Sequence, residues 1–145
     1  MNMEIICSSL SLDLHGFSGT AINKDYAGTA FKLMDKMWQI VKASQLANKG
    51  LNIWVYDSNE KIFAGVELTE TPNFDTGLEQ HTITLNRYAY CKHVGPYNLV
   101  KQTGQNMRNE LKNRGEVIRD PYIEIYGHWT SDESKLETTL IMCLA

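Results

Sequence analysis

Three carboxylates and three aromatic side chains are the residues of this chain that could carry chemistry together. They recur at alternate positions of strand-like segments, so that those within one segment share a face. Aromatic ring faces attract a positive charge by about 0.5–2 kcal/mol each, and a partly desolvated carboxylate adds to that attraction. The set favours a site for a flat, apolar cation and is also compatible with a general base. Its members are Trp54, Tyr56, Tyr126, Glu67, Glu124 and Glu137.

Strand alternation separates these side chains from the aliphatic ones beside them. In the segment YIEIYGH the two isoleucines share one face, and Glu124, Tyr126 and His128 share the other. The segment NIWVY has the same pattern, with Trp54 and Tyr56 opposite its Ile and Val. We expect the aliphatic faces to pack on helices and the aromatic faces to point away from them. There the aromatic faces are either exposed to solvent or covered by the other half of the chain.

The first half of the chain predicts a strand, a helix and a hairpin. Residues 4–14 alternate over part of their length and predict a strand, which HGFSG ends with a turn. Residues 26–46 carry a broad apolar face, which is typical of a helix packed on a sheet. The runs LNIWVYD and KIFAGVEL, joined at Ser58-Asn59-Glu60, then predict a β-hairpin.

The second half repeats this order. Residues 82–93 predict a strand, Gly95-Pro96-Tyr97 a turn into a helix, and YIEIYGHW with KLETTLIMCL a second hairpin. The fold class is therefore α+β, with tandem duplicated β-α-β-β halves at 1–72 and 79–145 in one domain over 1–145. We expect two antiparallel sheets, each backed by a helix, and a ligand groove between the halves, because clefts form where units meet.

Composition and charge exclude several classes of protein. Fourteen Lys and Arg against seventeen Asp and Glu give a net charge of −3, whereas a nucleic-acid binder is typically basic, so we expect no direct nucleic-acid contact. No apolar run approaches the ~20 residues that span a bilayer, and the first residues lack the basic region of a signal peptide. The three cysteines form no close pair, which fits a reducing cytoplasm.

Motifs for metals and cofactors are missing from the sequence. The histidines show no metal-ligand spacing, and no phosphate-binding or dinucleotide-binding glycine motif is present. We therefore expect no metal, no cofactor, no membrane association and a cytoplasmic location. The histidines are His15, His81, His93 and His128.

Several segments resemble the GyrI-like, or AraC-type effector-binding, domain family. In the second half they are YAYCKHVGPYNLV followed by a helix, PYIEIYGHW and the final LETTLIMCL; in the first half they are IWVYDS and FAGVELTE. The resemblance covers about residues 3–144. It implies the duplicated fold and a groove in which members bind small molecules, often lipophilic cations and drugs. Some members carry helix-turn-helix segments and regulate transcription, some stand alone, and a subset resembles hydrolases of cyclopropanoid compounds.

The resemblance also assigns site residues. It matches Glu124 and Tyr126 to one family strand, Tyr56 to the equivalent first-half strand and Glu67 to a Gly-Val-Glu segment. The family's pocket glutamate in the last strand falls on Thr139, and Glu137 lies two residues earlier on the same face. This departure weakens the cation-binding and hydrolase interpretations, although a threonine could donate a hydrogen bond to a neutral ligand.

Three functions stay open at this point. The leading one is non-catalytic, multidrug-type binding of a small, largely apolar or cationic aromatic molecule, for sensing, sequestration or transcription regulation. The second is a hydrolase of small electrophilic compounds with Glu124 or Glu137 as base. The third is a gyrase-inhibitor-like module that binds a protein partner, either a regulator or a DNA enzyme. Edge strands could also pair two copies into a homodimer. The expected ligand-binding residues are Trp54, Tyr56, Glu67, Tyr90, Glu124, Tyr126, Trp129, Glu137 and Thr139.

Overall fold

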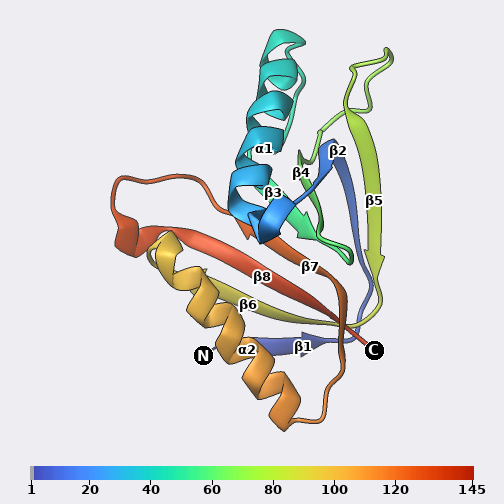
Figure 1. The fold of residues 1–145 in the computed structure, drawn as a ribbon. Helices are drawn as coiled ribbons and strands as arrows, with labels where there is room; N and C mark the ends of the chain where they lie inside the picture. Colours follow the sequence, from blue (N-terminus) through green and yellow to red (C-terminus); the bar gives the residue numbers. More distant parts are fainter. Residues whose placement is uncertain (1) are drawn as a thin grey trace.

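One antiparallel sheet of eight strands runs through the computed structural model, which describes residues 2–145 (Figure 1). Its strand order is β1-β6-β8-β7-β3-β4-β2-β5. The strands are β1 (Met3–Ile6), β2 (Leu10–Thr20), β3 (Asn52–Tyr56), β4 (Lys61–Val66), β5 (Glu79–Leu85), β6 (Tyr88–Val94), β7 (Ile118–Tyr126) and β8 (Glu137–Leu144). The helices are α1 (Tyr26–Ala43) and α2 (Val100–Asn113), with short 3₁₀ turns at Ile22–Lys24, Tyr97–Leu99 and Glu133–Lys135.

The α+β class and the repeated strand–helix–hairpin order are confirmed, but the two expected sheets are joined into one. Strand β3 of the first half pairs with β7 of the second, with Trp54 opposite Glu124 and Tyr56 opposite Tyr122. We call this β3–β7 junction the central seam. The two half-sheets join because each of them alone would leave a row of backbone hydrogen-bonding groups unpaired at its edge. Pairing β3 with β7 satisfies both rows.

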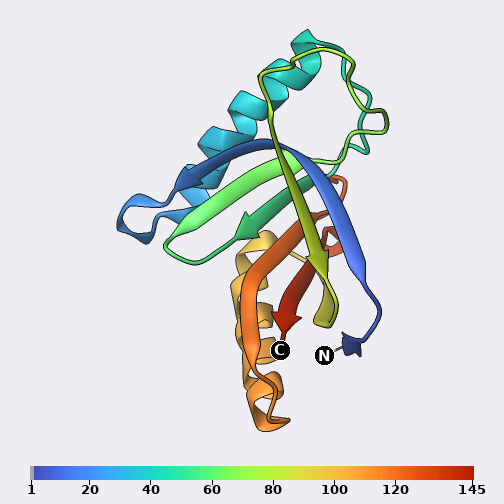
Figure 2. The same ribbon diagram turned by 90° about the vertical axis from the view of Figure 1, so that its right-hand side faces the viewer.

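The two halves also exchange their first strands. Strand β1 pairs with β6 of the second half, while β5 pairs with β2 of the first half. Figure 2 shows that the strands of the two half-sheets cross steeply instead of lying in one plane. The long strand expected over 82–93 is broken between β5 and β6, because these strands belong to different half-sheets.

The turn predicted at HGFSG is wrong, since these residues lie inside the eleven-residue strand β2. The glycines that suggested a turn allow two strands to approach closely. Gly16 pairs with Gly65 of β4, and a Cβ atom on Gly16 would lie 1.9 Å from the Ala64 carbonyl oxygen. The chain instead changes direction at residues 7–9, between β1 and β2.

Both helices cover the same face of the sheet, which we call the helix face. Helix α1 begins where the Asp25 carboxylate accepts a hydrogen bond from the Gly28 backbone N–H at 3.0 Å, and it packs Met37 on Phe17 and Val66. Helix α2 packs through the buried residues Val100, Met107 and Leu111 against β6 and β8. Within residues 2–145, neither helix is long and apolar enough to cross a bilayer.

The opposite face of the sheet carries no helix from the described part of the chain and is covered by the sheet itself. Ile53, Val55 and Ile123 are at most 1% exposed there, in one cluster with Leu14 of β2 and Ile141 of β8. The expectation that these aliphatic side chains pack on helices is therefore wrong. Alternation shows which residues share a face, but the steep crossing of the half-sheets decides what covers it.

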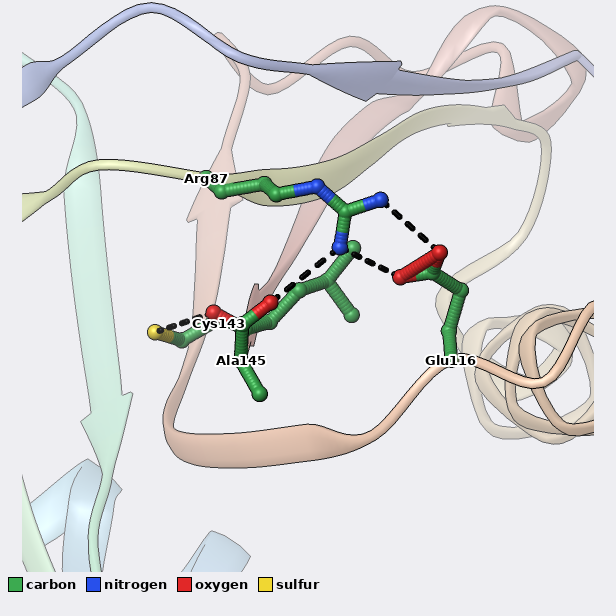
Figure 3. A network of polar contacts seen from close by, with 5 residues as sticks. Arg87, Glu116, Cys143 and Ala145 are labelled. Carbon is green, nitrogen blue, oxygen red and sulfur yellow. Dashed lines mark hydrogen bonds and ion pairs between the residues drawn. The ribbon is translucent and has the colours of Figure 1, made fainter.

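A polar network fixes the break between β5 and β6 (Figure 3). Arg87 Nη2 donates to Glu116 Oε1 at 2.8 Å, and Arg87 Nη1 donates to Glu116 Oε2 and, at 3.2 Å, to the Ala145 oxygen. The Cys143 thiol lies 3.9 Å from the Leu144 carbonyl oxygen in the same region. Arg87 thus ties the start of β6 to the segment that leads into β7 and to the residue after β8.

Candidate ligand-binding site

A cavity of about 700 Å³ opens between α1 and α2 over the central seam, and we call it the Glu124 cavity. Its floor is the helix face of β3 and β7, which presents aromatic rings and one carboxylate. Its walls are the start of α1 and the side of α2 that carries Val100, Gly104 and Arg108. The floor residues are Trp54, Tyr56, Tyr122, Glu124 and Tyr126. Because the floor combines one strand from each half, the site exists only when the halves associate.

Glu124 is the centre of this floor and is only 8% exposed. The Tyr56 hydroxyl donates to Glu124 Oε1 at 2.7 Å, and the Tyr126 hydroxyl donates to the same oxygen at 2.8 Å. The Tyr122 hydroxyl donates to Oε2 at 2.7 Å. Three of the roughly four acceptor positions of a carboxylate are therefore occupied by phenols.

The three phenols remain protonated because their surroundings oppose ionisation. Burial raises the pKa of Tyr56, Tyr122 and Tyr126 well above the usual value, and the negative charge of Glu124 raises it further. All three hydroxyls can therefore act as donors to the carboxylate. Among residues 2–145, no Lys or Arg forms an ion pair with Glu124.

Aromatic rings surround the carboxylate in close contact with one another. The Trp54 and Tyr126 ring centroids are 4.8 Å apart, and those of Tyr56 and Tyr122 are 5.3 Å apart. Tyr26 of α1 lies 5.7 Å from Tyr56, and Tyr97, just before α2, lies 5.7 Å from Tyr126. The rings provide electron-rich faces at several angles around one buried charge.

The rim of the Glu124 cavity carries charges of both signs. Arg108 of α2 lies over the Tyr122 ring, with the guanidinium carbon 5.3 Å from the ring centroid. Within the described chain, Arg108 forms no ion pair. The other charged rim residues are Lys24, Lys101, Asp25, Asp57 and Asp120.

A second cavity of about 460 Å³ adjoins the first and shares Trp54, Tyr97 and Tyr126 with it. Its outer wall includes Trp129, in the loop after β7, and Phe31 of α1. We call it the Trp129 groove. Among residues 2–145, no three Asp, Glu, His or Cys side chains are grouped as metal ligands.

The structure brings Trp54, Tyr56, Glu124 and Tyr126 together in the Glu124 cavity, on the helix face and not on the face expected for them. Trp129 lies in the adjoining groove. The remaining residues expected at the site lie elsewhere, because alternation in β6 and β8 turns Tyr90 and Thr139 to the helix-free face.

The two other glutamates expected at the site are paired with lysines outside both cavities. Glu67 Oε2 lies 3.2 Å from Lys49 Nζ. Glu137 is half-exposed, and its Oε2 lies 3.6 Å from Lys92 Nζ. Neither side chain lines the Glu124 cavity or the Trp129 groove.

Sequence reasoning missed several residues of the site. Tyr122 could have been found, since it precedes Glu124 by two positions and so shares its face. Arg108 and Tyr97 carried no such signal, because their place over the floor depends on how α2 packs. The sequence pattern places Tyr26 only at the start of a helix.

A duplicated α+β fold with a buried carboxylate in an aromatic cavity defines a small-molecule-binding domain. The chain belongs to the GyrI-like small molecule binding domain family, whose sequence model matches residues 33–144. The resemblance carried by the GPY turn and the IEIY strand is thereby confirmed. No curated protein matches the chain.

Solved structures share the fold over nearly the whole chain. The EcmrR C-terminal domain superposes with a TM-score of 0.75 at 13% identity, covering 100% of this chain and 99% of that one. The structure of SAV2435 bound to tetraphenylphosphonium superposes with a TM-score of 0.65 at 18% identity, covering 100% of this chain and 94% of that one. A hydrolase from Listeria innocua superposes with a TM-score of 0.60 at 12% identity, covering 99% of this chain and 91% of that one. At these identities the likeness shows the fold alone.

Proposed function

We propose that the chain binds a cationic, largely apolar aromatic molecule in the Glu124 cavity, in a sensing, sequestering or transcription-regulatory role. The observation that carries this proposal is the state of Glu124. A carboxylate that is 8% exposed normally has a cationic partner, yet this one has only phenols as partners within residues 2–145. A bound cation would supply the missing positive charge.

The surroundings of Glu124 support the same class of ligand. Coulombic attraction is several times stronger at a partly buried site than in water. The rings of Trp54, Tyr56 and Tyr126 add cation–π attraction and apolar contact area. The SAV2435 structure, which shares this fold, contains the lipophilic cation tetraphenylphosphonium. A compound of that type is therefore a suitable first probe.

The geometry favours binding over hydrolysis. A general base must accept a proton from water or substrate, and three hydroxyls already occupy the Glu124 oxygens. Glu137, the other candidate base, is 52% exposed and paired with Lys92. A protein partner, a homodimer, the lack of direct nucleic-acid contact and a cytoplasmic location stay predictions.

A matched pair of ligands tests the proposal. Methyltriphenylphosphonium and the neutral triphenylphosphine oxide carry the same three phenyl groups but differ in charge. We expect the cation to raise the melting temperature by several degrees, because saturation at about 100 times Kd stabilises a fold by about 2.7 kcal/mol. We expect a much smaller shift with the neutral compound. Equal shifts, or no shift with the cation, would overturn the proposal.

A further inference from the structure

The Trp129 groove differs in chemistry from the cavity beside it. Its lining contains no Asp, Glu, Lys or Arg side chain, whereas the Glu124 cavity carries seven. Apart from the Tyr97 and Tyr126 hydroxyls and the Trp54 and Trp129 indole N–H groups, its polar side chains are Asn52 and His128, and Asn52 Oδ1 already accepts a hydrogen bond from the Trp38 indole N–H at 2.6 Å. The groove is therefore suited to an apolar group.

Large apolar side chains at the groove are left exposed. Trp129 is 74% exposed and Phe31 is 53% exposed, although exposed indole and phenyl rings gain free energy when they are buried. Phe31 meets Trp54 edge-on at 5.2 Å. Within the described residues, Trp129 stacks on no other aromatic ring. Its indole is therefore available to contact a ligand.

The backbone holds the loop that carries Trp129 at a fixed place. The Gly127 N–H donates to the Glu137 carbonyl oxygen at 2.8 Å, and a Cβ atom on Gly127 would lie 2.9 Å from that oxygen. Only glycine allows this approach of the loop to β8. Trp129 follows two residues later, at the outer wall of the groove.

The groove and the cavity are neighbours that share lining residues. Trp54 and Tyr126 line both, and Tyr126 is also a hydrogen-bond donor to Glu124. The Trp54 and Tyr126 rings, 4.8 Å apart, therefore lie between the two spaces, and an apolar chain that starts beside Glu124 would cross them to reach the groove.

We infer that the Trp129 groove takes the apolar arm of a ligand whose cationic group lies in the Glu124 cavity. The ligand class is then an elongated amphiphilic cation, with a compact positive head and an alkyl or aryl arm. This inference rests on the proposed function, and it adds a length requirement that cation binding at Glu124 alone does not have.

A series of alkyltrimethylammonium ions tests this inference. The head group stays constant while the chain lengthens from butyl through octyl to dodecyl, at concentrations below micelle formation. Affinities are measured by titration calorimetry on the wild-type chain, Trp129→Ala, Phe31→Ala and Phe74→Ala. Phe74 is a matched control, because it is 52% exposed and lines a surface remote from the groove, beside the end of α1.

We expect the wild-type affinity to rise with chain length, by up to about fourfold per methylene group. The rise should be flattened in Trp129→Ala and Phe31→Ala and retained in Phe74→Ala, while the butyl compound binds all four proteins alike. A rise that is equally steep in Trp129→Ala, or no rise in the wild type, would overturn the inference.

The variant Glu124→Gln separates this inference from the proposed function. If it weakens the butyl compound while chain length has no effect, the groove inference fails and cation binding at Glu124 stands. If Glu124→Gln binds all of them as the wild type does, the proposed function fails and the groove inference fails with it. If no compound of the series binds while tetraphenylphosphonium does, the groove inference alone fails.

Discussion

Tyr56 and Glu124 are joined across the central seam by a hydrogen bond of 2.7 Å, although 68 positions separate them in the chain. Tyr56 belongs to β3 of the first half and Glu124 to β7 of the second. The bond lies on the floor of the Glu124 cavity, so the contact that helps to hold the halves together also shapes the ligand site. Binding and the stability of the seam are therefore coupled.

Removing one phenol should expose this coupling. Tyr56→Phe leaves a buried carboxylate oxygen with one donor fewer, so the free energy of unfolding should fall by about 1–3 kcal/mol. Urea unfolding followed by fluorescence measures the change. Tyr90→Phe is the matched control, because its ring packs on the helix-free face, and it should stay within about 0.5 kcal/mol of the wild type. Equal losses of unfolding free energy in the two variants would contradict a stabilising hydrogen bond from Tyr56 to Glu124.

The raised pKa of the floor phenols can be observed in alkali. Burial and the Glu124 charge keep Tyr56, Tyr122 and Tyr126 protonated beyond the usual tyrosine pKa of about 10. Their contribution to stability is present below that pH and is lost as the pH rises through the folded-state pKa. The tyrosinate absorbance of the folded protein near pH 11 should therefore be the same in Tyr56→Phe as in the wild type. A drop matching one of the seven tyrosines would show that Tyr56 ionises normally.

Arg108 should compete with a cationic ligand. Its guanidinium lies over the Tyr122 ring, on a surface that a bound cation would also use. Arg108→Gln should therefore strengthen tetraphenylphosphonium binding by roughly two- to fivefold, the range of an exposed cation–π contact. Lys101→Gln removes the same charge from the rim of the cavity. Because no aromatic ring of residues 2–145 lies beneath Lys101, the effect should be smaller. Weaker binding in Arg108→Gln would instead indicate that Arg108 holds an anionic group of the ligand.

The Arg87–Glu116 pair should make the free energy of unfolding depend on pH in the acid range. The hydrogen bonds from Arg87 lower the pKa of Glu116 from its ordinary value of 4.5. The stabilisation is therefore present above pH 4.5 and is lost as the pH falls through the lower folded-state value. Glu116→Gln should be less stable than the wild type at pH 7, and the difference should shrink toward pH 3. A difference that is unchanged between these pH values would contradict the pairing shown in Figure 3.

Local patterns in the sequence predicted the elements that depend on near neighbours. The helix that begins at Tyr26, the two hairpins and the common face of Glu124 and Tyr126 follow from the periods of helix and strand. Tyr56 and Trp54 were placed together for the same reason. These are the residues of the floor, so the centre of the candidate site could be predicted from sequence.

Long-range pairing could not be predicted in this way. Whether a strand face meets a helix or another part of the sheet depends on the crossing of the half-sheets, and this reversed the expected faces of Ile53 and Ile123. A glycine such as Gly16 favours a turn in a sequence, but here it allows β2 and β4 to approach closely. The location of Glu137 and Thr139 likewise depends on the pairing of β8 with β6 and β7.

If the buried charge of Glu124 holds a cationic ligand, removing that charge should weaken binding, and titration calorimetry measures the loss. Tetraphenylphosphonium is titrated into the wild type, Glu124→Gln and the control Glu137→Gln, with circular dichroism to show that all three are folded. We predict that Glu124→Gln weakens binding by roughly tenfold or more, because the coulombic attraction at a partly buried site is lost. Glu137→Gln should bind as the wild type does, since Glu137 is paired with Lys92 outside the cavity. Wild-type affinity in a folded Glu124→Gln protein would show that the charge of Glu124 does not hold the cation.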